Sequence, residues 1–193
     1  MLQPIPTLTA LLDANVLYPA PLRDVLMHLA TARLFRARWS AEIHEEWIRN
    51  LLRNRPDLSR ETLEGTRDMM LSAVPDGLVT RFEHLIPDLA LPDADDRHVL
   101  AAAVVGGADT IVTFNLKDFP KAALEPFGLV AQTPDEFIHE LLDANEDRVI
   151  LAIKRQRTLL SRPPKSVEAH LETLLEQKLP RTVARLRTRA SEL

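Results

Sequence analysis

Blocks of apolar residues with the spacing of strands alternate with helical blocks in the N-terminal part of the chain. Residues 9–17, TALLDANVL, form a short apolar run that predicts a buried strand with polar groups at its carboxyl end. Apolar residues then recur at helical spacing from Leu22 to Ala37, which predicts a helix. Residues 35–39 predict a second short strand, and Ser40 is a typical N-cap for the helix AEIHEEWIRNLL.

The same alternation continues as far as residue 131. Further helices are expected over residues 59–74 and 93–106, and further strands over residues 78–82, 110–114 and 129–131. The strands are apolar without regular alternation, which is typical of a parallel sheet covered by helices on both faces. We therefore expect a three-layer α/β fold, in which ligands bind beyond the carboxyl ends of the strands.

The C-terminal part of the chain has only helical patterns. Residues 133–136, TPDE, combine a cap, an early proline and first-turn acids, as at the start of a helix. Residues 162–165, RPPK, form the clearest linker, and a last pair of helices begins at Ser166. The sequence thus predicts an α/β domain at residues 1–132 and an all-helical region at residues 133–193.

The composition is that of an ordinary globular protein. The chain has 193 residues, of which 46% are hydrophobic and 27% charged, which suffices for a real core. It has no cysteine, so disulfides and thiolate metal sites are excluded. The N-terminus has no basic leader, and no apolar run approaches the ~18 residues of a membrane span. A cytoplasmic location without membrane attachment is the expectation.

The net charge of -4 hides an asymmetry along the chain. Residues 154–193 hold ten Lys and Arg against four Asp and Glu, whereas the remainder holds fourteen against twenty-four. A basic tail is typical either of a nucleic-acid contact or of plain solvated helix faces. Both interpretations stay open.

Two acidic residues, Asp13 and Glu46, border apolar stretches. Asp13 lies in the first predicted strand, where burying an unpaired carboxylate is costly, so it is either a helix cap or a metal ligand. Glu46 flanks the apolar stripe of Ile43 and Trp47, whereas the neighbouring Glu45 points outward. Glu46 is therefore favoured over Glu45 as a site residue.

Three acids, Asp93, Asp95 and Asp96, occupy the first turn of a predicted helix. The helix dipole favours acids there, by roughly 0.3 to 1 kcal/mol each. Three carboxylates so close together nevertheless repel one another unless a cation is present. Asp96 is the best ligand candidate, because Val99 and Leu100 place it on the buried side of the helix.

Polar residues also follow the predicted strand at residues 110–114. Asn115 comes directly after it, and Asp118 follows three residues later. Such residues are most often turn formers, but parallel strands end at one edge, so they can converge there with Asp13 and Asp96. Carboxylate and amide oxygens without a His or Cys cluster indicate Mg²⁺ or Mn²⁺ rather than Zn²⁺. Phosphodiester hydrolysis is the typical chemistry of such a site.

In order and spacing, these segments resemble the PIN-domain ribonucleases. The segments are LLDANVL with Asp13, the EEW helix with Glu46, DADDRHVLAAA with Asp96, and VTFNLKDF with Asn115 and Asp118. The arrangement is similar to that of VapC-type toxins of bacterial toxin–antitoxin pairs, in the subgroup with a helical C-terminal extension. The motifs cover roughly residues 8–131, and the tail resembles the extension more loosely.

The resemblance implies an endoribonuclease that depends on Mg²⁺ or Mn²⁺. It implies an acidic quartet supported by two polar groups, namely Asp13, Glu46, Asp96 and Asp118 with Thr113 and Asn115. Asp13 and Asp96 would chiefly hold an ion that orients the scissile phosphate and a water. Glu46 and Asp118 would position or deprotonate that water.

One position departs from the pattern of the family. Many members have an aspartate where this chain has Asn115, and an amide is a weaker ligand than a carboxylate. The second metal position is therefore in doubt. Asp93, one helical turn before Asp96, is the candidate to compensate.

The resemblance also implies three kinds of partner: an RNA substrate, a small VapB-type antitoxin and a second copy of the chain. Arg181, Arg185 and Arg189 recur every four residues and are candidates to hold the RNA backbone, with a solvated helix face as the alternative. The antitoxin is expected on the two helices that carry Leu22, Val25 and Leu29 and, further on, Trp47 and Ile48.

Other classes of protein fit the residues less well. A phosphatase of the haloacid dehalogenase type needs a second acid two residues after Asp13, where this chain has Asn15. A receiver domain needs an acidic pair near Asp13, which is missing. A non-catalytic RNA-binding relative of the PIN domain is favoured by Asn115 alone. Four retained acids oppose it, because a metal-free nucleic-acid surface would carry the opposite charge.

Overall fold

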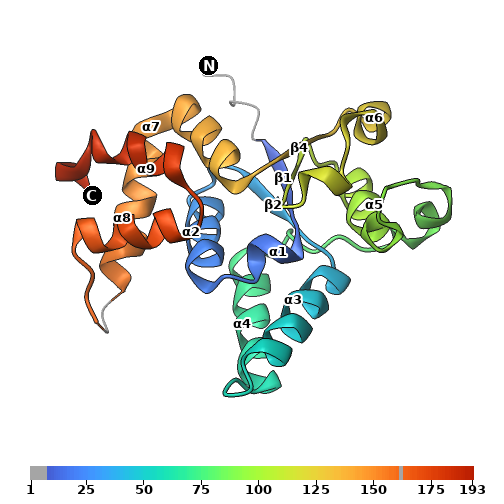
Figure 1. The fold of residues 1–193 in the computed structure, drawn as a ribbon, viewed down its shortest axis with the longest axis horizontal. Helices are drawn as coiled ribbons and strands as arrows, with labels where there is room; N and C mark the ends of the chain where they lie inside the picture. The colour runs from blue at the N-terminus through green and yellow to red at the C-terminus, as the bar shows by residue number, and fades with distance from the viewer. Residues whose placement is uncertain (1–7, 161–162) are drawn as a thin grey trace.

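Four short parallel strands form a sheet at the centre of the molecule, in the order β2-β1-β3-β4 (Figure 1). The computed structural model describes residues 8–160 and 163–193. The strands are β1 (Thr9–Leu12), β2 (Arg36–Arg38), β3 (Thr110–Val112) and β4 (Val130–Gln132). Leu11 of β1 lies in register with Ile111 of β3, so the carboxyl ends of the two central strands meet at one edge of the sheet. The expected parallel α/β architecture is confirmed.

Three predicted strands, β1, β2 and β3, are shorter than expected, and a fourth is replaced by other structure. β1 ends at Leu12, because the carboxylate of Asp13 accepts the amide of Ala14 at 2.6 Å and starts the short helix α1 (Ala14–Leu17). The prediction of a strand at residues 78–82 was wrong, since that segment makes only one isolated β-bridge, from Trp39 to Leu78. Arg81 has a φ of 65°, which a strand cannot accommodate.

In residues 8–132, five further helices follow α1. They are α2 (Ala20–Thr31), α3 (Ala41–Asn54), α4 (Arg60–Ala73), α5 (Arg97–Val105) and α6 (Lys121–Leu124). The same described residues hold four short 3₁₀ segments: η1 (Glu83–Asp88), η2 (Ala94–Asp96), η3 (Leu116–Asp118) and η4 (Glu125–Phe127). Ser40 accepts the amide of Ile43 at 3.1 Å and is the N-cap of α3, as predicted.

Two helices differ in extent from their sequence patterns. α2 ends before the expected Ala37, because Arg33 has a φ of 56° and turns the chain toward β2. α5 starts at Arg97 rather than at Asp93, since the acidic segment before it forms the 3₁₀ turn η2. The acids therefore lie in a tighter turn than an α-helix would give.

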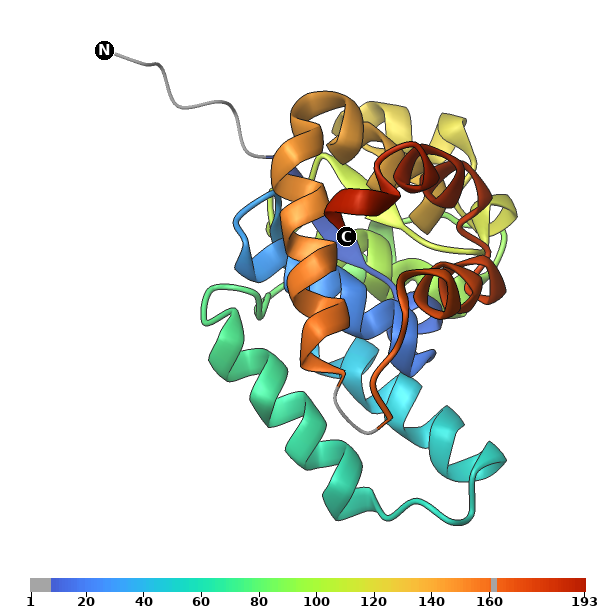
Figure 2. The ribbon, with the colours of Figure 1, turned by 90° about the vertical axis from the view of Figure 1, so that its left-hand side faces the viewer.

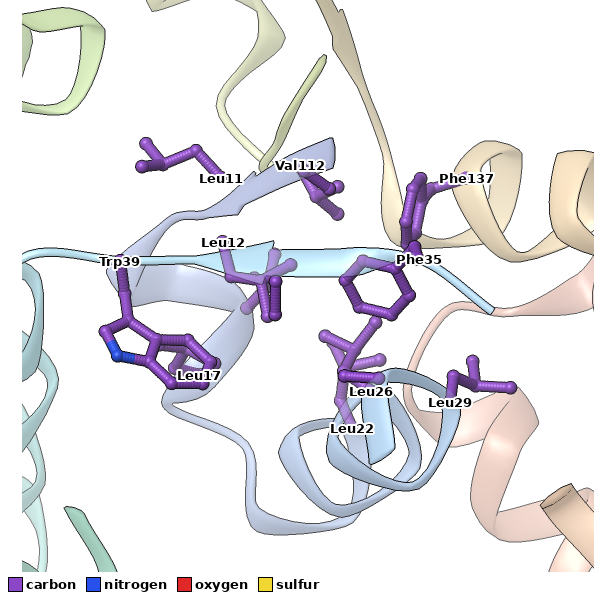
Figure 3. Close-up of a cluster of buried hydrophobic side chains, with 14 of the residues drawn as sticks. Leu11, Leu12, Leu17, Leu22, Leu26, Leu29, Phe35, Trp39, Val112 and Phe137 are labelled. Atoms are coloured by element: carbon purple, nitrogen blue, oxygen red, sulfur yellow. The ribbon is translucent and has the colours of Figure 1, made fainter. Parts of the chain in front are cut away.

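The helices cover the sheet and bury a continuous core. Figure 3 shows Leu22, Leu26 and Leu29 of α2 facing Leu12 and Phe35 on one side of the sheet. α5 packs against β1 and β3, and α3 and α4 project together from the body of the molecule (Figure 2). In the part of the chain that the structure describes, no helix has both the length and the apolar character of a membrane span.

In residues 133–160 and 163–193, the C-terminal region has three helices and a final turn: α7 (Pro134–Leu159), α8 (Val167–Glu176), α9 (Pro180–Arg187) and η5 (Ala190–Glu192). Thr133 and Glu136 form a capping box at the start of α7, and the helix is kinked at Asn145. The ring of Phe137 on α7 meets Phe35 edge-to-face at 4.8 Å. One buried cluster runs through both regions, so the helical region packs directly against the α/β domain.

The carboxylate of Asp135 fixes α9 on α7. Asp135 is buried and accepts the backbone amides of Arg181 and Thr182 at 2.9 and 2.8 Å. Both amides lie in the first turn of α9, where no residue of the same helix can accept them. A side chain from a distant segment thus sets the position of the last helix and of the turn that precedes it.

Candidate active site

Asp13 lies at the carboxyl end of β1 and holds the end of β3 beside it. The hydroxyl of Thr113 donates to the Asp13 carboxylate at 2.6 Å, and the Asn15 amide donates to the same oxygen, also at 2.6 Å. Asn15 also accepts the backbone amide of Phe114 at 3.0 Å. Thr113 then accepts the amide of Asn115 at 3.0 Å. The carboxyl ends of the two central strands are therefore joined by one hydrogen-bond network.

The environment of Asp13 opposes its ionisation. Asp13 is only 4% exposed. Burial, the largest effect, raises the pKa of Asp13 to about 6, and the charge of Glu46 adds to the rise, while the bonds from Thr113, Ala14 and Asn15 work the other way. A buried carboxylate held in this way needs a nearby positive charge, which a bound cation would provide.

Glu46 and Glu45 face different surroundings on α3. Glu46 is half-buried, and burial followed by the charge of Asp96 raises its pKa. Glu45 is exposed and forms an ion pair with Arg60 at 3.0 Å. Of the two glutamates, Glu46 is the one that lies toward the other acids.

Asp96, the last residue of η2, is electrostatically coupled to the other acids. Burial first, and then the charges of Asp13, Asp93 and Asp118, raise the pKa of Asp96 to about 6. Through these effects, acids from four segments influence one another: the end of β1, α3, η2 and η3. Asp93 stands slightly apart, since it is exposed and its carboxylate accepts the amide of Asp95 at 2.9 Å as the cap of η2.

The segment after β3 brings Asp118 toward the site but turns Asn115 outward. Asp118 is half-buried at the end of η3 and acts on the carboxyl of Asp96. Asn115 is exposed and contributes its backbone amide to Thr113.

Two polar residues at this edge were missed in the sequence. Asn15 bonds to both strand ends, and His98 places its Nε2 atom 3.8 Å from a carboxylate oxygen of Glu46. Both lie two residues after a predicted ligand, Asp13 and Asp96 respectively. Their position two residues after a predicted ligand was the signal that could have identified them. Polar residues at that spacing are equally common in turns that have no site.

Comparison with known proteins identifies the architecture. Residues 9–117 match the PIN domain family. This chain belongs to the PIN-domain family. Residues 134–188 match a second family, described as the VapC50 C-terminal domain. The chain is also 38% identical, over 119 residues, to a protein of Mycobacterium tuberculosis (strain ATCC 25618 / H37Rv) that is described as a candidate ribonuclease, VapC50. The match covers 60% of this chain and 70% of that relative, and no solved structure matches significantly.

The resemblance to the VapC-type subgroup with a helical extension is thereby confirmed. The PIN domain covers the strands and helices that carry every predicted site residue except Asp118, which follows the matched segment directly. The second family covers α7, α8 and α9. The acids of the site thus belong to the PIN part, with the helical part beside it.

The oxygen ligands at the site are of the kind that a hard divalent cation prefers, but they lie too far apart to coordinate one ion as they stand. Carboxylate oxygens from Asp13, Glu46, Asp96 and Asp118 are the ligands that Mg²⁺ and Mn²⁺ prefer. Across residues 8–160 and 163–193, however, no three acidic or imidazole groups lie close enough together to hold a metal ion. Burial first, and then the charges of neighbouring acids, raise the pKa values of Asp13 and Asp96, so both carboxyls ionise less readily in the absence of a cation.

Two of the three arginines predicted to form a stripe on the last helix pair within the protein, and one of them, Arg189, lies after α9 at the start of η5. Arg185 pairs with Glu146 at 2.5 Å, and Arg189 pairs with Glu146 at 3.0 Å and Asp147 at 2.9 Å. Arg181 lies at the first turn of α9, where its amide bonds to Asp135. The solvated-face alternative therefore describes Arg185 and Arg189 better than an RNA contact does.

The surface expected to receive an antitoxin is core instead. Leu22, Leu29, Trp47 and Ile48 have no exposed area, and Val25 is 1% exposed. These residues pack against the sheet and against neighbouring helices, so they cannot receive a partner. The sequence pattern could not separate an exposed apolar stripe from a buried one.

Proposed function

We propose that this protein is a metal-dependent endoribonuclease and the toxin of a toxin–antitoxin pair. The observation that carries the proposal is that Asp13, Glu46, Asp96 and Asp118, from four segments of a PIN-domain fold, lie near enough for their charges to raise the pKa values of the first three. Concentrated carboxylates are costly in a folded protein unless they bind a cation. The similarity to a protein described as a candidate ribonuclease supports RNA as the substrate.

In this proposal, Asp13 and Asp96 hold Mg²⁺ or Mn²⁺, with Asp93 as an additional ligand. When bound, the ion neutralises charge on the scissile phosphate and makes a bound water more acidic. Thr113 and Asn15 keep the Asp13 carboxylate in place, because both donate to it. The proposal keeps the division into a nuclease domain at residues 1–132 and a helical region at residues 133–193.

Glu46 and Asp118 position the attacking water and accept its proton. The water oxygen bonds to phosphorus while the bond from phosphorus to the leaving ribose oxygen breaks, and that oxygen takes a proton from solvent. Burial and the charge of Asp96 raise the pKa of Glu46, which makes it a better proton acceptor than an exposed glutamate. His98 lies beside Glu46 and restricts its position.

The partner of a toxin of this type would be a small antitoxin, and the chain is also expected to pair with a second copy. A non-catalytic RNA-binding role is the second candidate, favoured only by Asn115 in place of an aspartate. Asn115 is exposed, and the hydrogen bond that it makes in the network around Asp13 comes from its backbone amide. The amide in place of an aspartate at this position therefore affects a second metal position more than it affects the ion held by Asp13 and Asp96.

The test is cleavage of a mixed set of single-stranded and structured RNAs by purified protein with Mg²⁺, Mn²⁺ or EDTA. We expect cleavage with either ion, none with EDTA, and none in Asp13→Ala or Asp96→Ala. Asp88→Ala removes the same charge from an exposed position on η1 and should cleave like the wild type. Absence of cleavage by folded wild type, together with no metal binding in calorimetry, would move the binding role to first place.

A further inference from the structure

The turn between α8 and α9 places a lysine beside the acidic site. The Nζ atom of Lys178 lies 5.1 Å from the centre of the Phe114 ring. Phe114 directly follows Thr113, which bonds to Asp13, and its own amide donates to Asn15. A side chain from the helical region therefore reaches the carboxyl edge of the PIN-domain sheet.

The positive charge of Lys178 is available to a ligand. The other two lysines of the described C-terminal region donate within the protein, Lys154 to the carbonyl of Glu192 at 2.8 Å and Lys165 to Thr173 at 2.6 Å. Lys178 is exposed, and its ammonium group takes part in none of the side-chain hydrogen bonds or ion pairs of residues 8–160 and 163–193. An aromatic ring attracts an ammonium group without using its N–H donors as a carboxylate would.

The backbone at Lys178 is in the left-handed region, with a φ of 62°. Its amide donates to the carbonyl of Leu175 at 2.9 Å, and the next amide, of Leu179, donates to Leu174 at 3.2 Å. These two bonds form a Schellman motif at the end of α8, and glycine is the usual residue at the position that Lys178 occupies. The helix end alone therefore does not require a lysine, and a side chain here costs backbone strain.

Lys178 places an unpaired positive charge next to the acids of the site. The acids of the site repel a nucleic-acid backbone. Two of the predicted RNA-binding arginines are already paired, Arg185 of α9 with Glu146 and Arg189, which follows α9, with Glu146 and Asp147. An unpaired cation at the edge of the acids is what an RNA phosphate requires. Phe114 keeps the ammonium near that edge, since the ring is half-buried between the two regions.

We propose that Lys178 binds a backbone phosphate of the RNA substrate next to the scissile bond, so that the helical region supplies a substrate-binding residue to the PIN-domain site. This inference rests on the proposed ribonuclease function. Lys178 is a binding residue here, and the chemical step stays with the acids. The helical region then contributes directly to substrate affinity in addition to its packing on α2.

The experiment measures binding and cleavage separately. Binding of a fluorescently labelled single-stranded RNA of mixed sequence is followed by anisotropy in EDTA over a series of salt concentrations. We expect Lys178→Ala to weaken binding severalfold and to lower the slope of log Kd against log salt by about 0.7. Lys178→Arg should restore most of both. In Mg²⁺, Lys178→Ala should lower kcat/KM mainly through a higher KM.

Two further variants control for charge and folding. Arg155→Ala removes one positive charge from an exposed position on α7 and should match the wild type in both assays. Lys178→Gly suits the left-handed backbone, so it should melt at the same or a higher temperature than the wild type and yet show the same weak binding as Lys178→Ala. Loss of binding in that variant cannot be attributed to unfolding.

The outcomes separate the two proposals. If wild type cleaves RNA and Lys178→Ala has the Kd and salt slope of Arg155→Ala, the role of Lys178 is overturned while the ribonuclease function stands. Binding that depends on Lys178 without any cleavage by wild type would overturn the ribonuclease function and leave Lys178 as an RNA contact. A wild type that neither binds nor cleaves RNA would overturn both.

Discussion

The hydroxyl of Thr113 donates to the carboxylate of Asp13 at 2.6 Å across 100 residues of sequence. This bond joins the carboxyl ends of β3 and β1, and both partners are buried. Asp13 is thereby fixed in one orientation before any substrate arrives. Such preorganisation of a ligand is the structural requirement for an ion to be held in a defined position.

The first prediction concerns removal of that hydroxyl. Thr113→Val keeps the shape of the side chain but leaves the Asp13 carboxylate without one donor, so we expect ribonuclease activity to fall by about tenfold or more. The free energy of unfolding should fall by about 1.5 to 3 kcal/mol, the value of a hydrogen bond to a charged group. RNA cleavage and urea denaturation measure the two effects.

Thr113→Ser is the matched control for this variant. It keeps the hydroxyl and loses only a methyl group, so it should retain most of the activity. If Thr113→Val cleaves RNA as well as Thr113→Ser does, the hydroxyl does not position Asp13 for the reaction.

The second prediction concerns the cost of concentrating the acids. Asp96→Asn removes a half-buried charge that faces Asp13, Asp93 and Asp118, so in EDTA we expect the free energy of unfolding to rise by about 1 kcal/mol. In Mg²⁺ the stability advantage of Asp96→Asn should shrink or reverse, because the bound ion stabilises the wild type more than the variant. Thermal denaturation with and without Mg²⁺ distinguishes these cases. Equal gains from Mg²⁺ in both proteins would contradict a role for Asp96 in holding the ion.

The third prediction separates the two glutamates of α3. Glu46→Ala should abolish cleavage, since Glu46 faces Asp96 and His98. Glu45→Ala should keep it, and because the Arg60 partner of Glu45 is exposed, its loss should lower stability by no more than about 1 kcal/mol. The pair is matched in size and charge, and the assay is RNA cleavage at equal protein concentration. If Glu45→Ala loses activity and Glu46→Ala keeps it, the site glutamate is Glu45 and the assignment to Glu46 is wrong.

The parallel sheet was predictable because its strands bury both faces, and such strands appear in the sequence as unalternating apolar runs. Its boundaries were not. The carboxylate of Asp13 starts α1 one residue after β1, so a local cap ended a strand whose apolar pattern continued to Leu17. The strand expected at residues 78–82 was prevented by the positive φ of Arg81, which the sequence does not reveal.

The candidate site was predictable as a set of acids but not as a network. Acids at strand ends and at helix starts stand out against apolar surroundings, so Asp13 and Asp96 could be found by position. Asn15 and Lys178 could not, since each acts on a segment distant in sequence. The side chain of Lys178 reaches Phe114 through a left-handed turn and the placement of α8, neither of which follows from the pattern of residues around it.

The fourth prediction concerns stability at acidic pH. His44 on α3 is buried, and its Nδ1 atom accepts the indole N–H of Trp47 at 3.0 Å. Burial first, and then the charges of Arg67 and Arg23, lower the pKa of His44 to about 4 from an ordinary value of 6.5. The unfolded chain therefore takes up a proton on His44 between pH 6.5 and about 4, while the folded protein does not.

Because the unfolded state binds more protons in that range, the free energy of unfolding should fall as pH is lowered, by about 2 to 3 kcal/mol for this histidine. His44→Gln should flatten part of the pH dependence in urea denaturation. His170, whose pKa burial also lowers to about 4, contributes in the same direction. Asp13 and Asp96, whose pKa values are raised to about 6, contribute in the opposite direction, so the effect of His44 is read from the difference between variant and wild type. His84→Gln, at an exposed position, is the control and should leave the profile as it is in the wild type. If His44→Gln keeps the full wild-type slope between pH 6.5 and 4, then His44 is protonated in the folded protein and its burial is not maintained at low pH.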